Sequence, residues 1–103
     1  MRKPVAIFMF SCLAAVVGPA HADYALLVKN NCLACHQVDK RKYGPTLKEV
    51  AAKYANDSNA AQKLARKIRA GGSGVWGQDV MPPQPQVSQA DALALARYVL
   101  SLK

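Results

Sequence analysis

The sequence lacks the signatures of several large protein classes. No segment alternates apolar and polar residues with period two, so we expect no β-sheet. No apolar run is long enough to span a bilayer comfortably, because the longest extends only from Val5 to Val17. Internal repeats, low-complexity tracts and linkers are absent as well. These absences favour one small α-helical domain with no stable membrane insertion.

Residues 1–22 have the organisation of a secretory signal peptide. Arg2 and Lys3 form a positively charged start, Val5 to Val17 is mostly apolar, and Ala20-His21-Ala22 matches an A-x-A cleavage site. We therefore expect export to the periplasm, cleavage after Ala22, and a mature domain of residues 23–103.

Each candidate iron ligand is unique of its kind once this leader is removed. Removing 22 of the 103 residues leaves 81, which contain two cysteines, one histidine and one methionine: Cys32, Cys35, His36 and Met81. Cys12 belongs to the leader. A lipid on Cys12 is an alternative, but the residues before it are a poor lipobox. A domain this small has a thin core and usually needs a covalent or metal staple.

Cys32-Leu33-Ala34-Cys35-His36 is a C-x-x-C-H motif, the attachment site of a c-type haem. Two thiols at this spacing can each form a thioether with one vinyl group of a porphyrin, and His36 would be the proximal iron ligand. A thioredoxin-like redox pair, a zinc half-site and a plain disulfide are the alternatives. The first needs a βαβ context and the second needs another Cys/His pair, and the sequence has neither.

Met81 is the candidate for the second axial ligand. It lies in Val80-Met81-Pro82-Pro83, inside a Gly- and Pro-rich segment, 71–87, that is too long for an ordinary turn. Thioether sulfur favours ferrous iron and raises the reduction potential. The two prolines stiffen the segment Val80-Met81-Pro82-Pro83, which we call the Met81 strap. A filler of the core is the alternative role for this methionine. Two protein ligands on the iron suit electron transfer, so we expect a carrier and not an enzyme.

Basic residues outnumber acidic ones in the expected mature domain. Loss of Arg2 and Lys3 leaves 12 of the 14 Lys and Arg against 6 Asp and Glu, a net charge of +6. Export and the lack of basic–aromatic interleaving argue against nucleic acid, so we expect transient, acidic redox partner proteins. A basic rim around the haem edge would include Lys29, Lys40, Lys42 and Lys48. Solubility alone is the alternative explanation of the charge.

Four segments show the i, i+3, i+4, i+7 spacing of amphipathic helices: 24–31, 47–54, 61–68 and 92–99. Thr46 and Glu49 form a capping box before the second helix. Ser58 and Ser88 are the expected caps of the third and fourth, and Gly71-Gly72 would end the third.

Two features are candidates for contacts around the haem. A carbonyl of Gly44-Pro45 would accept the second ring N–H of His36 and fix the ring's orientation, with an ordinary turn as the alternative. Trp76 would either pack in the core or donate its indole N–H to a haem propionate.

Three polar side chains, Lys67, Arg69 and Gln84, are further candidates for contacts with the cofactor or its ligands. Lys67 and Arg69 would neutralise propionates, or else are ordinary solvated charges. Gln84 follows the strap, and its amide could donate to the Met81 sulfur.

Taken together, the motifs resemble those of the short bacterial class I monohaem cytochromes c, the c-551/c-552 group. The matching residues are 31–36, 38, 44–45, 51–54, 72–77, 81–83 and 98–103. The resemblance implies an all-α fold of four to five short helices around one covalently attached haem c. It also implies that the terminal helices cross near Leu27 and Tyr98.

The same resemblance implies a site and a role. Cys32 and Cys35 would hold the haem, His36 and Met81 would ligate the iron, Pro45 would accept from His36, and Trp76 would lie near a propionate. The protein would be a periplasmic electron shuttle, and we expect it to be a monomer. Its partners would be a quinol-oxidising complex, nitrite reductase, cytochrome c peroxidase or a terminal oxidase.

The chain departs from the family pattern at two places. Members of the family often have Pro directly before the ligand Met, where this chain has Val80 preceded by Asp79. They often have Trp at the position of Tyr98 in the C-terminal helix. A carboxylate two residues from Met81 would lower the potential and loosen the strap. This departure supports an alternative function, a haem-based sensor or ligand binder with a displaceable Met81. Catalysis would need a distal acid–base group, and no second histidine remains for it.

Overall fold

The structure, a computed structural model, describes residues 2–7, 9 and 19–103. Most of the apolar part of the expected signal peptide, including Cys12, lies outside these residues. Within the described part of the chain, no helix is long and apolar enough to cross a membrane.

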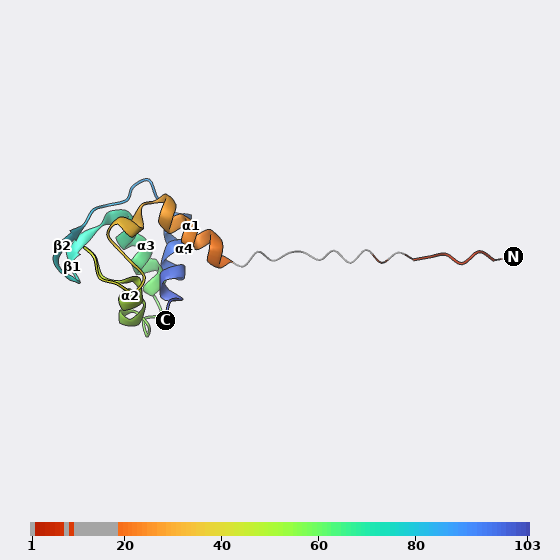
Figure 1. The fold of residues 1–103 in the computed structure, drawn as a ribbon, viewed down its shortest axis with the longest axis horizontal. Coiled ribbons are helices and arrows are strands. Elements are labelled where there is room, and N and C mark those ends of the chain that lie inside the picture. Colours follow the sequence, from red (N-terminus) through yellow and green to blue (C-terminus); the bar gives the residue numbers. More distant parts are fainter. Residues whose placement is uncertain (1, 8, 10–18) are drawn as a thin grey trace.

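Short helices make up most of the domain (Figure 1). In chain order the elements are α1 (Pro19–Lys29), the 3-10 helix η1 (Cys32–Ala34), α2 (Leu47–Lys53), α3 (Ala60–Ala70), β1 (Gly72–Gly74), β2 (Gly77–Met81) and α4 (Gln89–Leu100). Helix α4 packs against α1, α2 and α3, and Figure 1 shows β1 and β2 at the edge of the domain away from α1 and α4.

The hydrophobic core is centred on α4. Ala92 and Leu95 are 0% and 1% exposed, and they cluster with Val99 of α4 and with apolar residues from α1, α2 and the segment before α4: Leu27, Leu47, Val50 and Val87. Tyr98 packs against this cluster, in agreement with the expected crossing of the terminal helices. The core is small, because Leu95 and Val87 are its largest fully buried side chains in the described residues.

The predicted caps are confirmed for two helices. Glu49 donates its backbone N–H to the Thr46 hydroxyl at 3.0 Å and accepts the Thr46 N–H at 2.9 Å, which completes the capping box of α2. At α4, the Ser88 hydroxyl accepts the N–H of Asp91 at 3.1 Å.

The cap predicted at Ser58 is wrong. Helix α3 starts at Ala60, and its N-cap residue Asn59 makes no capping bond through its side chain. Instead, the Asp57 carboxylate accepts from Lys63 at 2.7 Å and from the backbone N–H of Asn59 at 2.8 Å. These two contacts, with Lys63 the larger, lower the pKa of Asp57. Asp57 therefore organises the turn that leads into α3.

The prediction of no β-sheet is also wrong, although the sheet is small. β1 and β2 form an antiparallel pair in which Gly72 is opposite Met81 and Gly74 is opposite Gly77. Alternation of apolar and polar residues arises when one face of a strand is buried. Most residues of both strands are exposed, so neither strand has a buried face that would produce this alternation in the sequence. The long segment before α4 thus contains a hairpin that ends at Met81.

Candidate cofactor site

One cavity brings together all six residues that the sequence predicts for the site. It has a volume of about 170 Å³, and its lining includes Cys32, Cys35, His36, Pro45, Trp76 and Met81. Leu27, Leu47, Val50, Leu64, Ile68 and Leu95 contribute apolar wall. Residues far apart in the sequence therefore share one mainly apolar pocket, as a large flat cofactor with two apolar faces would require.

The C-x-x-C-H segment folds into a tight turn at the cavity. Asn31 adopts a left-handed conformation, with φ of 60°, and starts the 3-10 helix η1. The carbonyl of Cys32 then accepts the N–H groups of Cys35 at 3.2 Å and His36 at 2.9 Å. Both thiols are free and half-buried, and burial raises the pKa of the Cys32 thiol. This turn presents two thiols and an imidazole to the same space.

A backbone carbonyl orients the imidazole of His36. Its Nδ1 lies 2.8 Å from the carbonyl oxygen of Pro45, the contact that the sequence predicts for Gly44-Pro45. A carbonyl oxygen can only accept, so we assign the proton to Nδ1, and Nε2 keeps its lone pair for a metal. The loop is held from both sides, because Gly44 donates to Cys35 O at 2.8 Å and Leu47 to Gln37 O at 2.9 Å.

Gly44 packs directly against the imidazole ring. A Cβ at this position would lie 2.6 Å from Cε1 and 2.9 Å from Nδ1 of His36. Gly44→Ala should therefore displace the ring and lower the free energy of unfolding by about 1–3 kcal/mol, as overpacking does. Denaturant unfolding of the haem-loaded variant measures the loss. Unchanged stability together with an unchanged haem spectrum would contradict this packing.

The Met81 strap is joined to the end of α3. Pro82 and Pro83 follow Met81, and the N–H of Gln84 then lies 3.2 Å from the carbonyl oxygens of both Ile68 and Arg69. The side chain of Gln84 donates to Pro82 O at 3.2 Å, so the predicted contact with the Met81 sulfur is absent from this structure. Gln84 therefore stabilises the strap through its backbone and through Pro82.

The basic residues of α3 differ in position. Lys67 lines the cavity, whereas Arg69 donates its Nε–H to the carbonyl of Val87 at 3.0 Å. Of the two predicted propionate partners, the structure thus brings only Lys67 to the cavity. Trp76 is half-buried there, and Lys53 Nζ lies 5.2 Å from the centroid of its ring.

Two residues of the site have contacts that the sequence does not reveal. Gly71 is predicted only as a helix end, but a Cβ there would meet Met81 O and Pro83 N of the strap. Tyr43 accepts the backbone N–H of Val80 at 3.2 Å through its hydroxyl. Tyr43 and Val80 are 37 positions apart in the sequence, and no spacing rule links them. The only sequence signal is the position of Tyr43 directly before Gly44-Pro45.

The donor set fits a c-type haem. Two neighbouring thiols can bond to the porphyrin edge, an imidazole with a free Nε2 can ligate iron, and a thioether lines the same cavity. Lys67 and Arg41 supply positive charge to the lining for the acidic groups of such a cofactor.

Comparisons with known proteins agree with this chemistry. A family model described as cytochrome c matches residues 24–103. The chain is 58% identical to cytochrome c-552 of Nitrosomonas europaea over 88 residues, which are 85% of each chain. It is 40% identical to cytochrome c-551 of Pseudomonas aeruginosa, covering 98% of this chain and 99% of that one. The crystal structure of the Nitrosomonas europaea cytochrome c552 superimposes with a TM-score of 0.76 at 57% identity, over 78% of this chain and 99% of that chain.

Proposed function

Because this chain belongs to the cytochrome c family, we propose that it is a periplasmic electron carrier with one haem iron ligated by His36 and Met81. Members of this family bind one haem c covalently through a C-x-x-C-H motif. The protein accordingly has one covalent haem c, and it exchanges electrons with redox partners instead of catalysing a reaction. The fold is that of a class I cytochrome c.

The observation that carries the ligand proposal is the meeting of two thiols, one imidazole and one thioether in one cavity. Cys32 and Cys35 would form the thioethers, and His36 and Met81 would bind the iron. The bond from His36 Nδ1 to Pro45 O leaves Nε2 as the ligating nitrogen and makes the imidazole a stronger donor. When bound, the haem supplies a one-electron ferric/ferrous couple.

The chain's own residues would keep the two ligands still during electron transfer. The Pro45 carbonyl holds the plane of the imidazole, and Pro82-Pro83 with the Gln84 N–H hold the methionine strap. A ligand set that hardly moves between redox states makes electron transfer fast. Trp76 and Lys67, both at the cavity, would contact the haem propionates.

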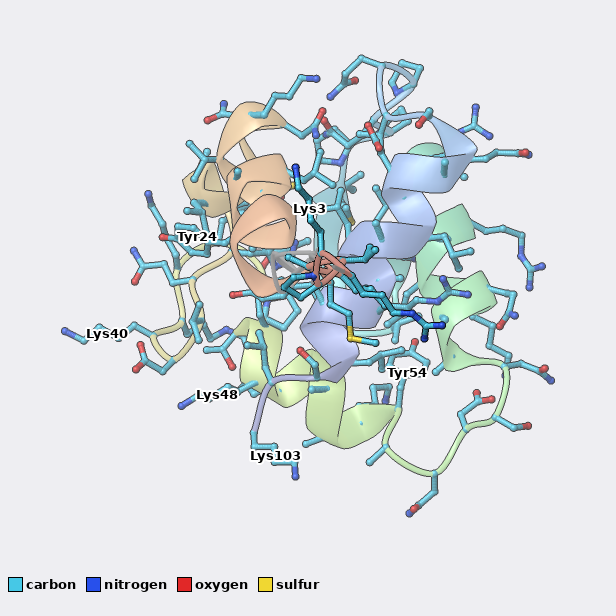
Figure 2. All side chains as sticks on the ribbon, turned by 90° about the vertical axis from the view of Figure 1, so that its right-hand side faces the viewer. Lys3, Tyr24, Lys40, Lys48, Tyr54 and Lys103 are labelled. Atoms are coloured by element: carbon cyan, nitrogen blue, oxygen red, sulfur yellow. The ribbon has the colours of Figure 1, made fainter. Side chains whose placement is uncertain are left out.

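The basic surface would guide acidic partners to the haem edge. Lys29, Lys40, Lys42 and Lys48 are all exposed, and Figure 2 shows Lys40 and Lys48 extending outward on the same side of the domain. A quinol-oxidising complex would be the donor. Nitrite reductase, cytochrome c peroxidase or a terminal oxidase would be the acceptor. The carrier would dock transiently, as a monomer.

Association with an acidic redox partner should slow as salt rises. We expect the bimolecular rate to fall by about tenfold between 10 mM and 200 mM salt, because screening shortens the reach of the basic rim. Stopped-flow mixing with the partner measures this rate.

A pair of double variants tests where the charge acts. Lys40→Gln/Lys48→Gln should lower both the rate and its salt dependence. Arg66→Gln/Arg97→Gln removes the same charge from exposed positions on α3 and α4 and should have a smaller effect. Equal effects of the two would mean that only net charge matters.

The visible spectrum of periplasmic extract from cells that express the chain tests the proposal as a whole. A sharp reduced α-band, with the weak long-wavelength sulfur-to-iron band in the oxidised form, is the expected result. A haem spectrum without the sulfur band, with carbon monoxide binding to the ferrous protein, would favour a sensor with a displaceable Met81. A haem protein found only in the cytoplasm would contradict export and cleavage of residues 1–22.

A further inference from the structure

One hydrogen bond joins the loop after His36 to strand β2, which ends at Met81. The backbone N–H of Val80 donates to the hydroxyl of Tyr43 at 3.2 Å. Tyr43 lies two residues before Pro45, whose carbonyl orients His36, and Val80 directly precedes Met81. Among the side chain–backbone hydrogen bonds of the described residues, this one spans the longest sequence separation, 37 residues.

Tyr43 is a fixed point and not a mobile side chain on a free loop. Its neighbour Gly44 donates to the carbonyl of Cys35 at 2.8 Å, inside the C-x-x-C-H turn. The backbone on this side is therefore tied to the segment that would hold the haem covalently. The Tyr43 hydroxyl can therefore restrain the backbone of Val80 relative to the cofactor.

At its start the strap is the end of β2, which pairs with β1 so that Gly72 lies opposite Met81, and this pairing stays within the hairpin. The side chain of Val80 is 55% exposed, so apolar burial holds it weakly. At the other end, the Gln84 N–H is bonded to the end of α3, and the close approach at Gly71 packs the strap against the same helix end. Met81 lies between these two ends, and the Tyr43 bond is the upstream contact that links the strap to the loop that carries His36.

Val80 has a donor that proline would not have. Proline lacks a backbone N–H, and it often stands directly before the ligand methionine in the family that this chain resembles. Val80 gives up the stiffness of a third proline, and its N–H is bonded to Tyr43. One hydrogen bond thus replaces a covalent restraint on the backbone.

We propose that Tyr43 is a positioning residue for Met81: its hydroxyl holds the start of the strap and keeps the sulfur on the iron. The proposal rests on the proposed ligation by Met81. An external ligand such as imidazole binds only molecules whose iron position is open, so its apparent affinity is reduced by the fraction that is open. Removal of the Tyr43 bond should increase that fraction.

The test is a titration of the haem-loaded, oxidised protein with imidazole, followed by loss of the sulfur-to-iron band. Tyr43→Phe removes only the hydroxyl. Its apparent dissociation constant for imidazole should be about two- to fivefold lower than that of the wild type, the change expected from the loss of one half-exposed neutral hydrogen bond. Denaturant unfolding of the same samples separates this effect from a change in overall stability.

Val80→Pro provides the matched control, because it removes the donor and restores a rigid backbone. In the Val80→Pro background, Tyr43→Phe should leave the imidazole constant unchanged. Equal constants for wild type and Tyr43→Phe, or the same Tyr43→Phe effect in both backgrounds, would overturn the role of Tyr43. A wild-type protein without the sulfur band would overturn the ligation by Met81, and this proposal with it. The two failures are thus distinguishable.

Discussion

Met81→Ala should leave the haem attached and lower its midpoint potential by about 0.1 V or more, within the roughly 0.8 V range over which axial ligands set haem potentials. The reason is that neutral thioether sulfur stabilises ferrous iron, and Met81 is the only methionine in residues 23–103. Attachment should persist because it depends on Cys32 and Cys35. Redox titration with spectral detection gives the potential, and the sulfur-to-iron band should disappear.

Val80→Ala is the control for this change. It trims an exposed side chain next to Met81 and keeps the backbone N–H that Tyr43 accepts. Its potential should stay near that of the wild type. If Met81→Ala retained the wild-type potential, Met81 would not be the ligand.

Gly71→Ala should strongly destabilise the protein. Gly71 has φ of 66° and ψ of −161°, a conformation that L-residues avoid, and a Cβ there would lie 2.7 Å from Pro83 N. Backbone strain costs about 1–3 kcal/mol, and overpacking costs about as much again. We therefore expect the free energy of unfolding to fall by about 3–5 kcal/mol, with a weaker sulfur-to-iron band because the strap must move.

Gly74→Ala separates strain from steric clash. Gly74 also has a positive φ, 99°, but a Cβ added there would meet no atom within 4 Å. The free energy of unfolding of Gly74→Ala should fall only by the cost of backbone strain, about 1–3 kcal/mol, and the variant should keep the sulfur-to-iron band. Denaturant unfolding of both haem-loaded variants gives the comparison. Equal losses would mean that the strap does not press on the end of α3.

Prediction from sequence succeeds where the information is local. The capping box at Thr46 and Glu49 and the cap at Ser88 are each settled within four residues, and both are present. The glycine that ends α3 is local in the same sense. Prediction fails at Ser58, because Asp57 and Lys63 form a competing contact. It also fails at the β1–β2 hairpin, where exposed glycine-rich strands carry no hydrophobic period.

The candidate site divides in the same way. C-x-x-C-H, the unique methionine and Gly44-Pro45 are visible in the sequence because each chemical role needs a particular residue type. The position of Gln84 predicts a bond to the Met81 sulfur, but its amide is bonded to Pro82 O. Arg69 is a candidate for the propionates by its charge, but it is bonded to Val87 O. The choice among nearby acceptors depends on packing, which residue type alone does not reveal.

The sequence by itself determined the chemistry of this protein: two thiols, one imidazole and one thioether, in a basic domain behind a predicted signal peptide. Only the tertiary structure decided how the ligand loops are held, through the Tyr43–Val80 bond and the close approach of the strap to Gly71. The physical reason is that donors and ligands are properties of side chains. A contact between residues 37 positions apart exists only after α4 and the helices packed on it have brought both loops to one cavity.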